Sequence, residues 1–234
     1  MLRSIIRNGF GIETLIGLCA SAFVVFCTMP IHEFAHALTA NKLGDNTAKN
    51  SGRLTLNPLA HIDIIGAAMI LLVGFGYAKP VPVNPRNFKN PKVGMAVTAA
   101  AGPVSNLIMA LVFLLLSNVS FAIYCNTVES IVAQVAFLFF FYAAMINVSL
   151  AVFNLIPIPP LDGSRIFGVF IPNKVYYKIM RYERYIIAVV FLLIWLGWLS
   201  TPLNWLTDKV IYGISWLVSR PFGEYGDLFM RFVA

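Results

Sequence analysis

Two histidines four residues apart, with a glutamate directly after the first, form the motif His32-Glu33-Phe34-Ala35-His36. Positions i and i+4 lie on one face of a helix, so His32 and His36 can present their imidazoles to one zinc ion. Glu33 then lies beside the metal, where its carboxylate can take a proton from a zinc-bound water. The motif therefore predicts a zinc hydrolase with Glu33 as general base. It supplies two of the three protein ligands that a catalytic zinc usually has.

The rest of the chain must place this motif in a membrane, because the composition is that of an integral membrane protein. Hydrophobic residues make up 59% of the 234 residues and charged residues only 12%, and the mean hydropathy is +0.79. The net charge of +7 comes from Lys and Arg that gather in two loops. Since no nucleic-acid motif accompanies them, they indicate contact with anionic lipid. We predict a lipid bilayer, and no nucleic acid, among the partners.

Charge-free apolar runs of about 20 residues predict the membrane spans. The first run, residues 14–31, should continue as a helix through the zinc motif to Lys42. The second, residues 93–128, is long enough for one span and a loop around Asn118. The helix of the third run, residues 130–161, should stop before Pro157. The later candidates are residues 185–207 and a shorter apolar piece ending near Arg220, as a fifth span or an interfacial helix.

The charge distribution decides whether the short apolar stretch 64–78 crosses the membrane. If this stretch does not cross, residues 41–92 and 162–184 lie on one side and carry twelve Lys and Arg, whereas the loop 118–130 on the other side carries none. That distribution follows the positive-inside rule. We therefore predict a re-entrant stretch 64–78, an N-terminus outside and a cytoplasmic basic side.

The same topology brings a third metal ligand to the zinc motif. The span 130–161 ends on the cytoplasmic side, and Asp162 is the only carboxylate close to that end. Three prolines break the helix before it, and a helix that restarts after Ser164 would place Asp162 near a helix N-terminus, which favours the ionised, ligating form. We predict that His32, His36 and Asp162 hold one zinc ion per chain.

These segments together resemble the site-2 protease family of intramembrane zinc metalloproteases, in its short branch without PDZ or CBS domains. The resemblance rests on the zinc motif, FNLIPIPPLDG at 153–163, GPVSN at 102–106, GRLTLNPLAHID at 52–63 and KPVPVNP at 79–85. It implies that His32, His36 and Asp162 ligate zinc, that Glu33 is the catalytic base, and that Asn154 lies beside the metal and helps to hold substrate or transition state. It also implies substrates that are membrane proteins with transmembrane helices.

A substrate helix must unwind before cleavage, and lipid cannot replace its backbone hydrogen bonds. The strand-like pieces 53–56 and 81–83 can pair with the unwound substrate or with each other. Asn106, Asn147 and Asn154 can also bond its backbone, although a lone intramembrane asparagine can equally bond a neighbouring helix. We expect Asn154 to act as both a catalytic and a substrate-binding residue, steadying the oxyanion, and Asn106 to bind substrate.

Three alternatives accompany this interpretation. His61 and Asp63 lie on the correct side to be metal ligands. Alternatively, both hold the loop to the start of the short helix that follows, with Asp63 as the N-cap of that helix. A membrane protease of the prenyl-processing type would take its third ligand from a distal glutamate. A catalytically idle metal-binding or scaffold protein could use the same fold, but it would not need Glu33.

The overall prediction is an all-α polytopic membrane protein with about 4–6 membrane helices and a short re-entrant or β-hairpin-like insertion near the active site. Residues 1–234 should form a single membrane domain, with a catalytic core at 10–170 and C-terminal membrane helices at 171–234. We expect the protein to be a zinc-dependent intramembrane endopeptidase in the plasma membrane of a prokaryote, with its active site toward the cytoplasm.

Overall fold

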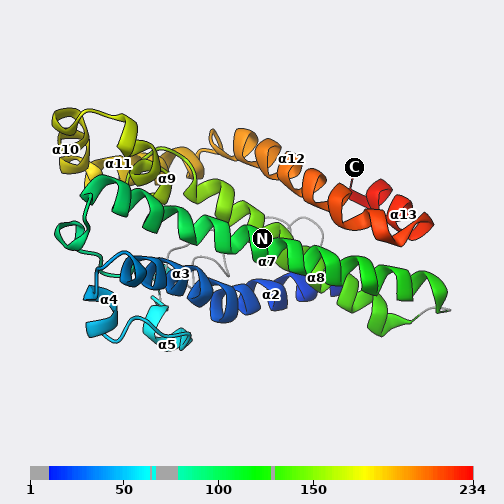
Figure 1. Ribbon diagram of the computed structural model, residues 1–234. Helices are drawn as coiled ribbons and strands as arrows, with labels where there is room; N and C mark the ends of the chain where they lie inside the picture. The colour runs from blue at the N-terminus through cyan, green and yellow to red at the C-terminus, as the bar shows by residue number, and fades with distance from the viewer. Residues whose placement is uncertain (1–10, 64, 67–78, 128–129, 234) are drawn as a thin grey trace.

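The computed structural model describes residues 11–63, 65–66, 79–127 and 130–233. Within these ranges the chain is mostly helical and contains no β-strand, and the long helices run along the molecule (Figure 1). The all-α prediction is therefore confirmed. Residues 53–56 and 81–83 are not strands, so these two pieces do not form the predicted β-hairpin with each other. Nearly all of the predicted re-entrant stretch 64–78 lies outside the described residues.

The first long helix consists of α2 (Ile12–Phe23), the π-helical turn η1 (Val24–Thr28) and α3 (Met29–Lys42). Pro30 has no N–H to donate to the carbonyl four residues earlier, and the π turn directly before α3 accommodates this break. The helix Ile12–Lys42 contains an 18-residue stretch with a mean hydropathy of 2.0, and its 31 residues are long enough to cross a membrane. The prediction of a helix that continues through the zinc motif to Lys42 is confirmed.

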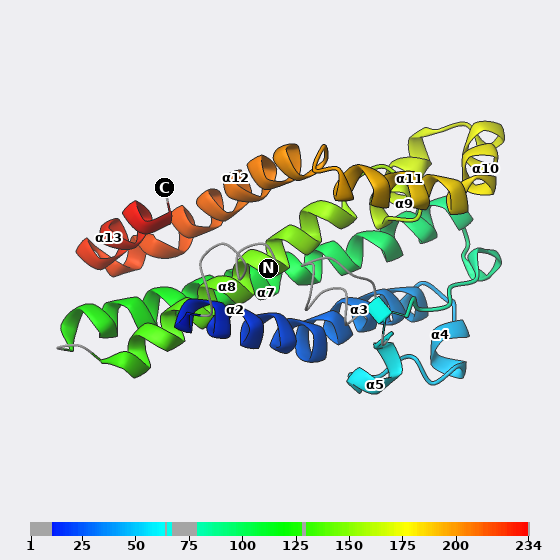
Figure 2. The same ribbon diagram turned by 180° about the vertical axis from the view of Figure 1, so that it is seen from behind.

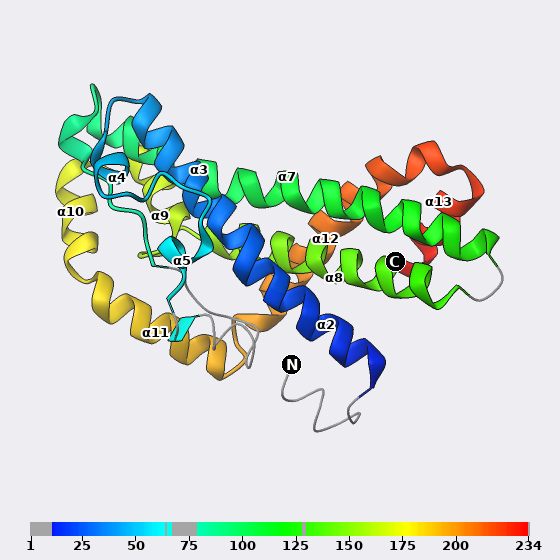
Figure 3. The same ribbon diagram turned by 90° about the horizontal axis from the view of Figure 1, so that it is seen from below.

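Two further helices are long and apolar enough to span, α7 (Pro91–Asn126) and α8 (Ile131–Asn154). They run side by side and form the centre of the molecule, with α3 packed on α7 and α2 on α8. Figure 3 shows α2 crossing α8 obliquely while α3 reaches the end where α7 begins. Small buried residues of α7 and α8, such as Ala110, Ala144 and Ala151, allow this close approach. Three candidate spans are therefore present in the described part of the chain.

The predicted loop around Asn118 is wrong, because α7 passes through this position as unbroken helix. The Asn118 amide donates to the Leu114 carbonyl at 3.0 Å, and its Oδ1 accepts from the Ser219 hydroxyl at 3.1 Å. Both polar groups of this side chain are thus satisfied inside the helix bundle. An asparagine with such partners does not need a loop or water.

The C-terminal part is a series of shorter helices: α9 (Asp162–Phe167), η3 (Gly168–Phe170), α10 (Asn173–Arg181), α11 (Glu183–Trp195), α12 (Ser200–Ser219), η4 (Arg220–Phe222) and α13 (Glu224–Val233). The candidate span 185–207 is not one continuous helix, because α11 ends at Trp195 and α12 begins at Ser200. Gly197 lies between them with a φ of +81°, which suits a glycine just after a helix. Seen from behind in Figure 2, α12 and α13 lie along α8 and α7. The total of 4–6 spans stays a prediction.

Short helices connect α3 to α7, namely α4 (Thr47–Asn50), α5 (Pro58–His61) and the 3₁₀ turn η2 (Pro85–Asn87). Asp45 is fully buried and links two of these connecting segments through hydrogen bonds. Its Oδ2 accepts from the Asn84 N–H at 2.7 Å, and its Oδ1 accepts from the Asn87 amide at 2.7 Å and from Thr47. Burial alone would raise the pKa of Asp45, but these hydrogen bonds hold it below its ordinary value.

Replacing Asp45 with Ala should lower the free energy of unfolding in detergent by about 3 kcal/mol, because buried donors lose their acceptor. Since the folded-state pKa is depressed, the contribution of Asp45 is complete above the ordinary aspartate pKa of about 3.9 and is lost as pH falls through the folded-state value. The difference between wild type and Asp45→Ala should therefore shrink below about pH 4. The exposed Asp208 provides the control, Asp208→Ala. Equal stability of wild type and Asp45→Ala at neutral pH would refute this role.

Candidate metal centre and active site

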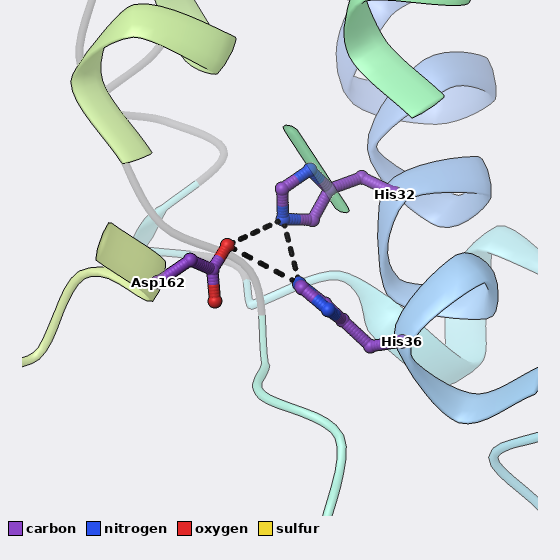
Figure 4. A group of neighbouring side chains, drawn as sticks. All are labelled: His32, His36 and Asp162. Atoms are coloured by element: carbon purple, nitrogen blue, oxygen red, sulfur yellow. Dashed lines mark hydrogen bonds and ion pairs between the residues drawn. The ribbon is translucent and has the colours of Figure 1, made fainter. Parts of the chain in front are cut away.

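Three potential metal ligands from two separate helices converge at one point (Figure 4). The Nε2 atoms of His32 and His36, both on α3, lie 3.0 Å apart. Oδ2 of Asp162, the first residue of α9, lies 3.4 Å from Nε2 of His32 and 3.3 Å from Nε2 of His36. Among the described residues this is the one group of three or more His, Cys, Asp or Glu that could hold a metal ion.

The geometry of these donors fits a zinc ion. Ligand atoms placed tetrahedrally at about 2.0–2.1 Å from zinc lie about 3.3 Å from one another, close to the three separations in this cluster. Two imidazoles and one carboxylate are a ligand set used by catalytic zinc, which keeps one position open. The residues present therefore suit zinc without a fourth protein ligand.

The Thr98 carbonyl of α7 orients one of the two imidazoles. It lies 2.7 Å from Nδ1 of His36, and because a carbonyl can only accept, Nδ1 must carry the proton. The other ring nitrogen, Nε2, is then free to bind a metal, which is the usual arrangement for a metal-binding histidine. Sequence analysis missed Thr98, because a backbone carbonyl acts here and the residue type gives no signal.

Asp162 reaches the cluster because the chain turns sharply after α8. That helix ends at Asn154, before Pro157 as predicted, and α9 begins at Asp162. Gly163 permits the turn: a Cβ there would lie 2.3 Å from the Leu155 carbonyl oxygen. The prediction that Asp162 lies at a helix N-terminus is confirmed.

Gly102 of α7 leaves room for the two imidazoles. A Cβ at this position would lie 2.4 Å from Nε2 of His36 and 2.5 Å from Cε1 of His32. Both distances are too short for real atoms, so any side chain here would displace the rings. The sequence motif at 102–106 thus contributes a close packing contact to the metal site.

Replacing Gly102 with Ala should weaken zinc binding about 10- to 100-fold, as changes beside metal ligands do. The added methyl group pushes the rings out of the ligand geometry. Zinc content after dialysis against a competing chelator measures the effect. Gly213→Ala is the matched control, since nothing lies within 4 Å of a Cβ at that glycine. Unchanged zinc affinity in Gly102→Ala would contradict the packing argument.

The cluster opens into a cavity of about 360 Å³ that also contains the predicted catalytic residues. Glu33, Asn106 and Asn154 all line it. Glu33 is mostly buried, and its Oε2 accepts a hydrogen bond from the Val81 N–H at 3.2 Å. Helix α11 forms another part of the wall through Glu183, Ile187 and Val190. Sequence analysis did not find the contact with Val81, which is again made by the backbone.

The remaining candidates lie away from the metal cluster. The His61 ring nitrogen Nε2 lies 2.8 Å from the Thr55 carbonyl oxygen, and His61 is not a member of the cluster. Asp63 accepts hydrogen bonds from the N–H groups of Ile65 and Gly66, both at 3.0 Å. His61 thus bonds within its own loop, and Asp63 accepts from the N–H groups two and three residues ahead, as an N-cap does. The short helix predicted to follow Asp63 lies almost wholly outside the described residues. Asn147 is buried and donates to the Ala143 carbonyl of its own helix at 2.8 Å.

Comparison with known proteins gives one family and several relatives. Residues 20–197 match the model of peptidase family M50. The chain is similar to two proteins that carry the name "Putative zinc metalloprotease", YwhC and Rip2. It is 42% identical to YwhC of Bacillus subtilis over 179 residues, which are 75% of this chain and 79% of YwhC. It is 31% identical to Rip2 of Mycolicibacterium smegmatis, over 61% of this chain and 52% of Rip2. No solved structure matches the chain significantly.

Proposed function

The chain belongs to peptidase family M50, and on this basis we propose that it is a zinc-dependent intramembrane endopeptidase. Its substrates would be membrane proteins, cut in or near their transmembrane helices. The observation that carries the proposal is the convergence of His32, His36 and Asp162 in the same cavity as Glu33. Three helices that are apolar enough to span support the membrane setting. An idle metal-binding protein is not favoured, because such a protein has no use for a carboxylate beside its metal.

His32 and His36 would hold the metal through their Nε2 atoms, and Asp162 through its carboxylate. When bound, zinc acts as a Lewis acid that polarises a carbonyl and increases the acidity of water. One oxygen of Glu33 is engaged by Val81, which leaves the other to accept a proton from the attacking water and to pass it to the leaving amine. Asn154 would donate its amide hydrogen to the developing oxyanion.

The cavity also offers groups for an unwound substrate. Oδ1 of Asn106 is buried without a hydrogen-bond partner, and an N–H of the substrate backbone could supply one. Since Asn106 lines the cavity, we assign it to substrate binding. Asn154 would serve both binding and catalysis.

We further propose that the active site lies toward the cytoplasm of a prokaryotic cell. Helices α4, α9 and α10 lie at the end of the molecule where α3 ends and α7 begins (Figure 1). The two basic loops 41–92 and 162–184 contribute these helices. Basic residues favour the cytoplasmic face, so the metal cluster between α3 and α9 would lie near that face.

The test is cleavage of a single-pass membrane protein by the purified protein in liposomes, with the products identified by mass spectrometry. We expect a cut within or close to the transmembrane helix. A zinc chelator should stop the reaction, and added zinc should restore it. Cleavage that persists in the chelator, or cleavage of soluble peptides alone, would reject the proposal.

A further inference from the structure

An extended segment, residues 79–84, passes the cavity beside Glu33. Its sequence Lys-Pro-Val-Pro-Val-Asn alternates proline with other residues. Prolines restrict the residues before them to extended conformations and have no N–H of their own. Backbone groups of alternate residues in an extended chain point to the same edge. Val81 and Val83 therefore supply N–H donors on one edge, whereas Pro80 and Pro82 supply none on the other, where the N–H of Asn84 is bonded to Asp45.

The donor of Val81 is already used by the catalytic machinery. Its N–H bonds Oε2 of Glu33 at 3.2 Å, and both Val81 and Val83 line the cavity. A glutamate side chain has three rotatable bonds, and one hydrogen bond from a fixed backbone amide limits the orientations of its carboxylate. Contacts that hold the segment in place therefore also restrict the orientation of the Glu33 carboxylate.

A buried arginine holds the segment directly before Val81. Arg53 is only 8% exposed, and its guanidinium Nη2 donates to the carbonyl of Lys79 and, at 3.3 Å, to that of Pro80. Lys79 in turn donates its N–H to the His61 carbonyl at 2.8 Å. Among the described residues, no carboxylate forms an ion pair with Arg53. Hydrogen bonds from a charged guanidinium are stronger than those between neutral groups, so Arg53 holds the backbone of Lys79 and Pro80 firmly in place.

We propose that Arg53 is a positioning residue of the active site: it fixes the carbonyls before Val81 so that the Val81 N–H holds the Glu33 carboxylate toward the metal cluster. This inference rests on the proposed function, in which Glu33 is the general base. Arg53 is not a member of the metal cluster and does not itself line the cavity; its bond to the cavity wall goes to the backbone carbonyl of Pro80. Its loss should therefore reduce the chemical step more than substrate binding.

The experiment compares kcat, KM and zinc content of variants in the liposome assay. Arg53→Gln should lower kcat about 10- to 100-fold, as a misplaced catalytic group does, while zinc stays at one per chain and KM changes little. Arg53→Lys, which keeps a cation, should recover most of the lost rate. Arg86→Gln, at an exposed arginine after the same segment, is the control and should behave as wild type.

A second variant removes the hydrogen bond from the other end. Val81→Pro deletes the N–H but keeps an extended backbone, and it should lower kcat as much as Arg53→Gln. The kcat of the double variant should be no lower than that of the less active single variant, because both substitutions break the same interaction. A wild-type kcat in Arg53→Gln, a loss of zinc with it, or multiplied losses in the double variant would each overturn the inference.

Glu33→Gln separates this inference from the proposed function. If Glu33→Gln is inactive and Arg53→Gln is fully active, only the positioning role of Arg53 fails. If Glu33→Gln cleaves as fast as wild type, the proposed function itself fails.

Discussion

Replacing Glu33 with Gln is expected to lower the cleavage rate at least about 1000-fold, within the range for loss of a general base. Gln has nearly the same shape and can still accept a hydrogen bond from Val81, so the cavity should keep its form. It cannot take up a proton at neutral pH. The rate of product formation from a transmembrane substrate measures the effect, together with zinc content.

The zinc content decides how this result is interpreted. Glu33 is not a member of the metal cluster, so Glu33→Gln should still bind one zinc ion per chain. Glu224→Gln, at an exposed glutamate of α13, should leave both rate and zinc unchanged. A Glu33→Gln variant that retains zinc and cleaves at the wild-type rate would exclude Glu33 as the base.

Replacing Asp162 with Ala should weaken zinc binding by more than about 100-fold, beyond the usual effect of changes outside the ligand set. The substitution removes the one carboxylate of the cluster and leaves two imidazoles, which are too few for a catalytic zinc site. Activity should be lost with the metal. Competition with a chelator of known affinity gives the dissociation constant.

The control for this prediction is Asp208→Ala, which removes an exposed carboxylate from α12. It should bind zinc as wild type does. If Asp162→Ala retained wild-type zinc affinity, the third ligand would have to come from another residue. His61, the alternative from sequence analysis, lies bonded to the Thr55 carbonyl instead.

The convergence of the three metal-binding candidates could be predicted because each of them has a local signal. The spacing of His32 and His36 places them on one helix face. The prolines before Asp162 predict a break in the preceding helix, and the basic loops predict that both helix ends lie on one side of the membrane. Simple rules on spacing, proline and charge were therefore enough for the core of the site.

The contacts around this core could not be predicted, because most of them use the backbone. The Thr98 carbonyl and the Val81 N–H act through groups that every residue type carries. The two errors in the helices have different causes. Asn118 stays within α7 because Ser219, 101 residues away in sequence, satisfies it. The break after α11 could have been anticipated from Gly197, a residue that commonly follows a helix end.

The central claim is that two histidines of the first long helix and Asp162 bind the same zinc ion. Zinc-edge X-ray absorption of the loaded protein tests it most directly, with Asp162→Ala measured alongside. We predict two imidazoles and an additional oxygen at about 2.0–2.2 Å from zinc in the wild type, and the loss of this environment in the variant. A sulfur ligand at about 2.3 Å, or the same spectrum for wild type and Asp162→Ala, would contradict it.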